Sequence, residues 1–234
     1  MELQSIVYSV YFHGDQKPLL CLQYLPLFAC EGYNEVNVTP PIGRIHSLNQ
    51  YRRNVERAFR LAISGTPGTG KTTIVSLLES QGYNTISLEL LAEKYGCLGE
   101  LDPSDNSKPI DIDRLCNELN IAWSENPDYS IIIDGHLSHQ LPCNQVVILR
   151  CRPDILEMRL EKRDYSKEKI RGNVEWELIG GPWNDKEYSN GWLELDTTES
   201  NEEVIFEQIH NWIIDGFKPT SVDTEIDWIG VMEE

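Results

Sequence analysis

Residues 65–72, with the sequence GTPGTGKT, constrain the fold of this chain more than any other feature. They fit the pattern G-x-x-x-x-G-K-[ST], which forms a phosphate-binding loop between a strand and a helix. The apolar run 61–63 precedes the loop as a buried strand would, and residues 73–78 follow it with helical spacing. The pattern therefore predicts a strand, a loop and a helix in an α/β domain, and it makes a chance match in a glycine-rich turn the weaker interpretation.

The residue types in this loop suit phosphate chemistry. Glycines such as Gly68 and Gly70 let the backbone curl so that its N–H groups point at an anion, and the helix N-terminus adds its positive dipole end. Lys71 can reach the β- and γ-phosphates, and the Thr72 hydroxyl can ligate Mg²⁺. The loop therefore predicts that the chain binds a nucleoside triphosphate such as ATP, with Mg²⁺ as its cofactor.

Composition narrows the class of protein further. With 234 residues, of which 40% are hydrophobic, the chain is long enough for one α/β domain and a small appendage. No apolar run approaches the roughly 20 residues that cross a membrane, and residues 1–10 lack the positive charge of a signal peptide. The cysteines include no C-x-x-C pair, so free thiols are expected. These features predict a cytoplasmic protein with no membrane partner.

The net charge of −18 argues against nonspecific nucleic-acid binding, and we expect no direct DNA binding. Basic residues nevertheless concentrate in residues 150–171, which hold Arg150, Arg152, Arg159, Lys162, Arg163, Lys167, Lys169 and Arg171. A cationic cluster in an acidic chain suits a bound polyanion such as ATP. The alternative is a solvated helix whose basic residues form i,i+4 ion pairs with acidic neighbours, and both can hold on different faces.

The chain divides by pattern into an N-terminal extension of unknown role, residues 1–58, and a domain of residues 59–234. The extension shows no repeat and no catalytic constellation, and we expect a strand at 5–12 and a short helix at 47–59. Disorder or a start-site artefact is a second interpretation of this segment, because no methionine occurs between Met1 and Met158.

From residue 59 onwards strands and helices alternate. The expected strands are 60–64, 84–88, 130–134, 145–150 and 192–196, and the expected helices are 71–80, 89–95, 111–124, 153–162, 167–178 and 201–215. The strands are short and apolar, as in a sheet that is covered on both faces. The alternation therefore predicts a three-layer, doubly wound parallel sheet, whose ligands bind beyond the carboxyl ends of the strands.

The run Ile131-Ile132-Ile133-Asp134 reads as a buried strand that ends in a carboxylate. In proteins with a phosphate-binding loop such a carboxylate supports Mg²⁺ together with the loop hydroxyl, so Asp134 and Thr72 are the candidate metal residues. Gly135 permits a tight exit from the strand, and His136 then projects toward the rim, where it can orient water or a nucleotide group. The plainer interpretation is a turn cap followed by a surface histidine.

Two further segments are candidates for the second substrate and for closure. Residues 87–110 lie where nucleotide kinases bind their monophosphate, and Lys94, Lys108 and Arg114 can meet a phosphate there, although a solvated loop is nearly as consistent. Residues 162–172 lie between two helices and can act as a lid. Closure of that lid would bring Arg163 onto the transferring phosphoryl group and exclude water.

The motifs together resemble the archaeal branch of the adenylate kinase isoenzyme 6 family. The resemblance runs from about residue 60 to residue 228 and rests on GTPGTGKTT at 65–73, DGHLSH at 134–139, LR at 149–150, RLEKRDYSKEK at 159–169, NVEWEL at 173–178, DTT at 196–198 and IDW at 226–228. It implies a nucleoside monophosphate kinase fold with short monophosphate-binding and lid segments. It also implies reversible phosphoryl transfer from ATP to AMP, ATPase activity, and a role in late maturation of the small ribosomal subunit through a platform protein.

Site residues follow from the resemblance motif by motif. Gly68, Gly70, Lys71, Thr72 and Thr73 would hold the ATP phosphates. The pair formed by Asp134 and His136 and the lid residue Arg163 would act with Lys71 in catalysis, and the turn at 196–198 would lie near the adenine. Many relatives have Leu-Ala-Arg-Glu where this chain has Leu-Ala-Glu-Lys at 91–94, so the AMP assignment of Lys94 and Arg114 is weaker.

A second function class stays open at this stage. The chain is either an adenylate kinase of broad specificity or an assembly factor whose ATPase cycle switches a ribosomal contact. Residues 172–234 hold sixteen acidic and two basic residues, which would let them imitate ribosomal RNA toward a basic protein. A merely solubilising acidic surface explains the same count. Oligomeric state and the preferred monophosphate do not follow from the sequence.

Overall fold

The computed structural model describes residues 10–11, 19–20, 58–101, 108–163, 165–185, 191–218 and 226–233. The chain forms two units, Met1–Pro41 and Ile42–Glu234. In the first, β1 (Val10–Tyr11) pairs with β2 (Leu19–Leu20) in an antiparallel ladder. Strand β1 lies inside the strand expected at 5–12, whose other residues are outside the described ones. The helix expected at 47–59 lies outside them up to residue 57, and residues 58 and 59 are not helical.

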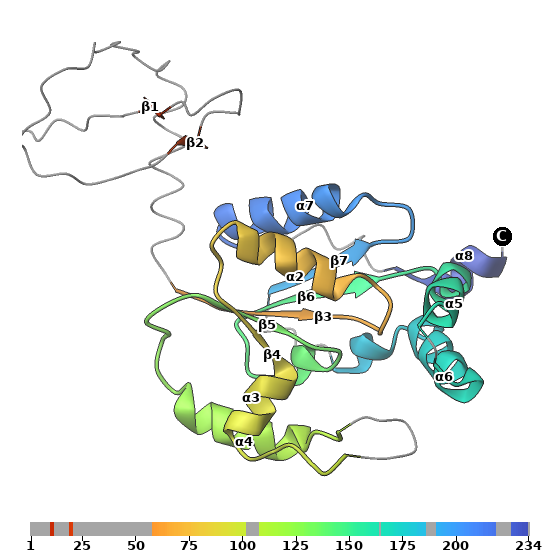
Figure 1. The fold of residues 1–234 in the computed structure, drawn as a ribbon, viewed down its shortest axis with the longest axis horizontal. Coiled ribbons are helices and arrows are strands. Elements are labelled where there is room, and N and C mark those ends of the chain that lie inside the picture. The colour runs from red at the N-terminus through yellow and green to blue at the C-terminus, as the bar shows by residue number, and fades with distance from the viewer. Residues whose placement is uncertain are drawn as a thin grey trace, which may run out of the picture. The chain divides into compact units, whose positions relative to one another are not determined.

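The second unit is built on a five-stranded parallel sheet in the order β4-β5-β3-β6-β7 (Figure 1). Its strands are β3 (Arg60–Ser64), β4 (Thr85–Ser87), β5 (Ile131–Asp134), β6 (Gln145–Arg150) and β7 (Gly191–Asp196). All five expected strands are present, with ends that differ by at most a residue from the expected ones. This is the doubly wound α/β fold of a nucleoside monophosphate kinase, as predicted.

All six expected helices also form. They are α2 (Lys71–Ser80), α3 (Leu88–Lys94), α4 (Ile112–Ala122), α5 (Pro153–Glu161), α6 (Lys167–Leu178) and α7 (Glu202–Ile214). Four of these helices are capped at their N-termini by a side-chain oxygen that accepts a hydrogen bond from a backbone N–H of the first turn. The capping residues are Ser87, Asp111, Ser166 and Asn201. Three short helices were not expected: η1 (Ser138–Gln140), η2 (Gly181–Asp185) and α8 (Trp228–Glu233). Each is too short to show helical periodicity in the sequence.

The sheet separates two hydrophobic cores. Because side chains alternate along a strand, Leu61 and Ile63 of β3 face one core, and Ala62 between them faces the other. Helices α2 and α7 cover the first face, and α3 and α4 cover the second (Figure 1). Burial on both faces accounts for the continuous apolar runs in the strand sequences.

Helices α5 and α6 form a hairpin beyond the carboxyl ends of the strands, toward the same end of the unit as the phosphate-binding loop (Figure 1). Leu156 and Leu160 of α5 pack with Ile170 of α6 in a third, smaller apolar cluster. The predicted lid segment, residues 162–172, begins at the end of α5, and its residues from 167 onwards form the first turns of α6. Within the described residues, no helix is long and apolar enough to cross a membrane.

Candidate active site

The loop between β3 and α2 has the backbone that its glycines predict. Gly65, Gly68 and Gly70 have φ values of 139°, 99° and 95°, a region that other residues rarely adopt. A Cβ on Gly65 would lie 2.3 Å from the carbonyl oxygen of Leu149, and a Cβ on Gly68 would lie 2.8 Å from Cδ1 of Leu156. The loop therefore packs directly on β6 and α5, and side chains at these glycines would displace it.

Lys71 closes back on the loop that it follows. Its Nζ donates to the carbonyl oxygens of Gly65 at 2.6 Å and Thr66 at 3.1 Å. Burial lowers the pKa of Lys71 to about 8 from an ordinary 10.5; the Asp134 carboxylate opposes this shift, and the positive charge of Arg163 adds to it. Thr72 and Thr73 are exposed at the start of α2. Lys71 thus lies within electrostatic range of both Asp134 and Arg163.

Asp134 ends β5 between two other strands, in register with Ile63 of β3 and Ser87 of β4. Its Oδ1 atom is buried and accepts no hydrogen bond from any described residue. Burial raises the pKa of this carboxyl, and the neighbouring Lys71 lowers it in part. A buried carboxylate oxygen with spare acceptor capacity next to the phosphate loop suits a hydrated Mg²⁺. Among the described residues, no three His, Cys, Asp or Glu side chains come together as a metal site. Most ligands of an Mg²⁺ ion bound here would therefore be nucleotide and water oxygens.

His136 is tied to the loop by its ring. Nδ1 lies 3.1 Å from the carbonyl oxygen of Gly65, and since a carbonyl only accepts, Nδ1 carries the proton. Burial is the main reason that the pKa of His136 is lowered, so the neutral ring is favoured and Nε2 keeps a lone pair. The hydroxyl of Ser64 donates to the His136 carbonyl at 2.5 Å and fixes the backbone. His136 can therefore accept a hydrogen bond from water at the rim.

Arg159 is a site residue that we did not predict beyond its membership of the basic cluster. Its guanidinium donates to the carbonyl oxygens of Thr197 at 2.8 Å and Thr198 at 3.0 Å, and approaches that of Gly68 at 3.5 Å. It thus ties the phosphate loop to the turn after β7. A cavity of about 260 Å³ lies here, lined by Gly68, Thr69, Gly70, Ile74, Arg159, Thr197, Ser200, Glu202 and Ile205. The turn that the resemblance places near the adenine, residues 196–198, contributes Thr197 to the lining of this cavity.

The predicted lid and monophosphate segments contribute exposed basic side chains. Arg163 follows α5 and is exposed. Lys94 at the end of α3 is exposed and lies over the Tyr95 ring, 5.6 Å from its centroid. Nη2 of Arg114 lies 4.0 Å from the position that a Cβ on Gly96 would take. The structure thus brings Lys94 and Arg114 to the same end of α3, whereas Lys108 is an exposed residue of the following loop.

The basic cluster of residues 150–171 divides between several roles. Arg171 pairs with Glu175 at i,i+4, and Arg152 pairs with Asp154, as solvated surface ion pairs. Arg150 ends β6, as expected, but its side chain is fully buried and does not face an open rim. Its guanidinium instead pairs with the carboxylates of Glu177, from the motif at 173–178, and Glu194, from the strand expected at 192–196, neither of which had a predicted role.

The sheet order, the glycine loop, Lys71 and the carboxylate at the end of β5 define a P-loop nucleotide-binding protein of the α/β kinase type. Residues 61–180 match the family model described as AAA domain. A protein of Pyrococcus abyssi named "Putative adenylate kinase" is 40% identical over 177 residues, which are 74% of this chain and 93% of the relative. A protein of the same name from Archaeoglobus fulgidus is 34% identical over 182 residues, which are 74% of this chain and 94% of that one.

These matches show that the chain belongs to the archaeal adenylate kinase family that the motifs resemble. Among solved structures, shikimate kinase from Acinetobacter baumannii in complex with shikimate has a TM-score of 0.48 and 14% identity, covering 69% of this chain and 96% of that one. A score below 0.5 gives this likeness no weight for function.

Proposed function

We propose that the chain is an Mg²⁺-dependent adenylate kinase that transfers the γ-phosphoryl group of ATP reversibly to AMP. The observation that carries the proposal is the placement of Lys71 on the phosphate loop, where the Asp134 carboxylate and the positive charge of Arg163 both act on its ammonium group. The loop lysine, a metal-supporting carboxylate and a lid arginine are the groups that phosphoryl transfer needs around one γ-phosphate. The name of the relatives at 40% and 34% identity supports the same activity.

Catalysis in this proposal is positional and electrostatic, without a covalent intermediate. The backbone N–H groups around Gly68 and Gly70 and the ammonium of Lys71 bind the phosphates. Thr72 and, through water, Asp134 would hold Mg²⁺, which neutralises charge on the phosphates when bound. Lid closure would place Arg163 beside the phosphoryl group and exclude water, so that transfer to AMP competes well with hydrolysis.

The acceptor would bind beside α3. Lys94 and Arg114 supply positive charge at one end of this helix, and the other end begins directly after β4, beside Asp134. An oxygen of an AMP phosphate held there would attack the γ-phosphorus of ATP bound at the separate phosphate loop, and the bond from that phosphorus to the leaving ADP would break. Exposed lysine and arginine side chains alone bind a phosphate weakly, which fits the weaker sequence assignment.

ATP hydrolysis would be a second activity of the same site. The neutral His136 ring is held against the loop by its Nδ1–H group, so Nε2 can accept a hydrogen bond from a water molecule. A water oriented in this way next to the γ-phosphate would be the nucleophile. The histidine at the position predicted by the DGH motif is the observation in favour of this activity.

A role in late maturation of the small ribosomal subunit and its rRNA is the second candidate function. The sequence resemblance implies it, with a platform protein of that subunit as partner, and the acidic composition of residues 172–234 would suit a basic ribosomal protein. In this alternative the ATPase cycle switches the ribosomal contact and the kinase activity is vestigial.

The buried thiols Cys97, Cys143 and Cys151 form no disulfide, which favours a reducing compartment such as the cytoplasm.

The test is ADP formation with Mg²⁺, measured with ATP plus AMP and with ATP alone. A working adenylate kinase gives strong acceleration by AMP, with two ADP formed for each ATP consumed. Hydrolysis that AMP does not change would reject the kinase assignment and favour the ATPase switch. Binding to purified small-subunit platform proteins, with ATP and with ADP, then decides whether the ribosomal contact exists.

A further inference from the structure

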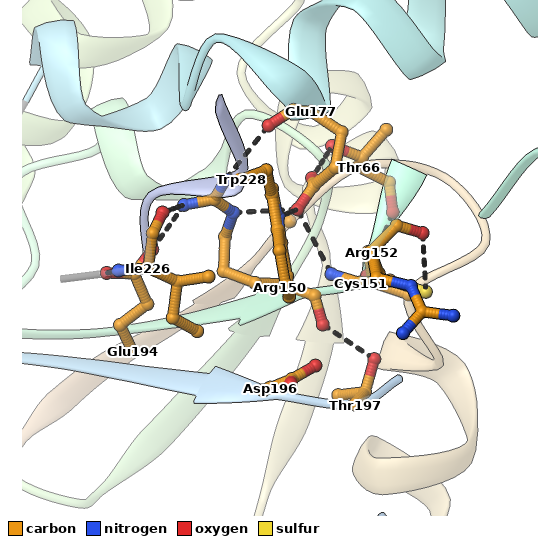
Figure 2. A network of polar contacts seen from close by, with 12 residues as sticks. Thr66, Arg150, Cys151, Arg152, Glu177, Glu194, Asp196, Thr197, Ile226 and Trp228 are labelled. Carbon is orange, nitrogen blue, oxygen red and sulfur yellow. Dashed lines mark hydrogen bonds and ion pairs between the residues drawn. The ribbon is translucent and has the colours of Figure 1, made fainter. Parts of the chain in front are cut away.

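A buried polar network lies directly behind the phosphate loop (Figure 2). Its centre is the guanidinium of Arg150, whose side chain has no exposed surface. Nε donates to Oε1 of Glu177 at 2.7 Å, and Nη1 donates to Oε1 of Glu194 at 2.5 Å. Three elements, β6, α6 and β7, therefore meet in one set of ion pairs that water does not reach.

Glu177 is the member of this network that contacts the loop. Its Oε2 accepts from the hydroxyl of Thr66 at 2.5 Å, and its Oε1 accepts from Arg150, from the N–H of Cys151 at 3.0 Å and from Nε1 of Trp228 at 3.0 Å. Thr66 connects this carboxylate to the phosphate site, because its carbonyl oxygen accepts from Lys71 Nζ at 3.1 Å. One carboxylate thus connects the loop to three donors.

The third donor comes from the C-terminal segment, residues 226–228. Trp228 is 4% exposed, and its ring centroid lies 5.9 Å from the Arg150 guanidinium. The backbone of Ile226 adds two contacts: its N–H donates to Oε2 of Glu194 at 3.2 Å, and its carbonyl oxygen accepts from Nη1 of Arg150 at 3.2 Å. The segment therefore closes the network on the side that faces away from the loop.

The charge balance explains why these contacts matter. Two carboxylates share one guanidinium in a buried space, so the remaining negative charge depends on neutral donors such as Trp228 Nε1–H and the Cys151 N–H. Loss of the Trp228 donor leaves the Glu177 carboxylate with one hydrogen bond fewer and less fixed in position. Because Thr66 holds Lys71 through its carbonyl oxygen, a displaced Glu177 changes the position of the cation that meets the phosphates.

We infer that Glu177 and Trp228 are positioning residues for the phosphate site, and that the C-terminal segment 226–228 sets the geometry of the loop through Thr66. Nucleotide binding and docking of the C-terminal segment are therefore energetically coupled. Glu177 also lies in the last turn of α6, whose first turns belong to the predicted lid, so the same carboxylate links this helix to the loop. The inference rests on triphosphate binding in the proposed function but not on transfer to AMP.

The test compares Trp228→Phe with Trp183→Phe in the full chain. Both substitutions keep an aromatic ring beside Arg150 and remove one indole N–H, but Trp183 donates to Glu194 and not to Glu177. Binding of the non-hydrolysable analogue AMP-PNP with Mg²⁺ is measured by calorimetry, without AMP. We expect Trp228→Phe to raise the Kd about threefold to tenfold, because only part of the free energy of one charge-assisted hydrogen bond is transmitted to the nucleotide. Trp183→Phe should change the Kd less than twofold.

Equal effects of the two substitutions, or none for Trp228→Phe, would overturn the inference, since a merely structural role predicts similar losses. A double-mutant cycle with Thr66→Val adds a second readout. Coupling through Glu177 predicts that Trp228→Phe has little further effect once the Thr66 hydroxyl is gone, whereas additive losses contradict it.

The unaltered chain offers a readout that does not depend on a variant that folds poorly. In protein labelled with ¹⁵N-tryptophan, the indole N–H signal of Trp228 is assigned by its loss in Trp228→Phe or, failing that, Trp228→Tyr. Titration with AMP-PNP should shift this signal, and an unmoved Trp228 signal at saturation would reject the coupling. Absence of AMP-stimulated turnover in the separate ADP assay would count against the kinase proposal alone.

Discussion

Lys71 is a residue whose role follows from its motif and whose pKa depends on its surroundings in the structure. The sequence pattern predicted its role, because the G-x-x-x-x-G-K spacing is local. The structure adds that burial and the charge of Arg163 lower its pKa to about 8. A bound triphosphate would place negative charge beside the ammonium and raise that pKa again.

This shift predicts that nucleotide binding takes up a proton above pH 8. The protonated form of Lys71 binds phosphate, so deprotonation of the free protein weakens affinity as the pH rises through about 8. Between pH 7 and pH 9 we expect the Kd for ADP to rise about tenfold. Calorimetry at pH 8.5 in two buffers with different ionisation enthalpies measures the proton directly. Lys71→Ala serves as the control, because it should lose phosphate-dependent binding altogether; a flat affinity profile in the unaltered chain would rule out a depressed pKa.

His136 predicts a separation of two rates. Replacing it with glycine removes both the Nδ1–H bond to Gly65 and the lone pair on Nε2. If the ring orients water, His136→Gly should lower ATP hydrolysis by about 10²-fold or more, the usual worth of a positioned proton acceptor, with a smaller loss in transfer to AMP. Rates of ADP formation with and without AMP give both numbers. A proportional fall in the two rates would mean that the histidine only supports the loop.

Whether the role of a site residue could be predicted depends on how far along the sequence its contact partners lie. Lys71, Asp134 and His136 are visible in short motifs, because a strand end and its loop fix them locally. Arg159 and Glu177 act through contacts with residues 38 and 111 positions away, at Thr197 and Thr66. No local pattern encodes such contacts, and the repeated basic and acidic residues around them suggested surface ion pairs equally well.

At the scale of elements, the exit of β5 depends on one glycine. A Cβ on Gly135 would lie 2.4 Å from Cβ of Leu88, the first residue of α3. The sequence suggested this glycine for a tight turn, and the structure shows a close approach of two elements instead of a positive φ. The register of β5 beside β4 requires that approach, because α3 starts directly after β4.

We therefore expect Gly135→Ala to destabilise the fold by about 1–3 kcal/mol, the usual cost of overpacking. Gly172→Ala is the matched control, because Gly172 lies inside α6 with no atom within 4 Å of an added Cβ. That control should be neutral or stabilising by up to about 1 kcal/mol. Urea unfolding of both variants measures the difference; equal midpoints would show that α3 moves away at no cost.

One substitution tests the predicted lid. Arg163 adds positive charge near Lys71 although its residue is exposed. Arg163→Ala should lower kcat by about 10-fold or more and leave the Kd for ATP within about threefold, since an arginine that meets the phosphoryl group mainly stabilises the transition state. Lys162→Ala removes a neighbouring exposed charge and should leave kcat within about twofold. A loss in ATP affinity alone would assign Arg163 to ground-state binding.

At the scale of the whole molecule, the alternation of elements predicted a parallel sheet but not its strand order. Right-handed crossovers limit the possible orders, and the phosphate-loop strand lies in the middle, between β5 and β6. The docking of the C-terminal segment under the sheet end did not follow from the sequence, because its contacts to Glu177 and Glu194 join segments 51 and 32 residues apart. Periodicity identifies elements, whereas such closing contacts depend on the assembled fold.

The boundary of the catalytic unit leads to the last prediction, that a chain starting at residue 58 keeps full stability and turnover. The hydrogen bonds that anchor the start of the central strand β3 begin at Phe59, whose N–H donates to Ser130 Oγ, and at Arg60, whose guanidinium donates to the carbonyl oxygens of Trp123 and Glu125. The shortened chain keeps all of them, so its Tm should stay within about 2 °C of the full chain, which corresponds to less than about 1 kcal/mol. A chain starting at Leu61 loses these hydrogen bonds and should melt several degrees lower. A large loss of Tm or of ADP formation in the chain from residue 58 would mean that residues 1–57 belong to the working enzyme.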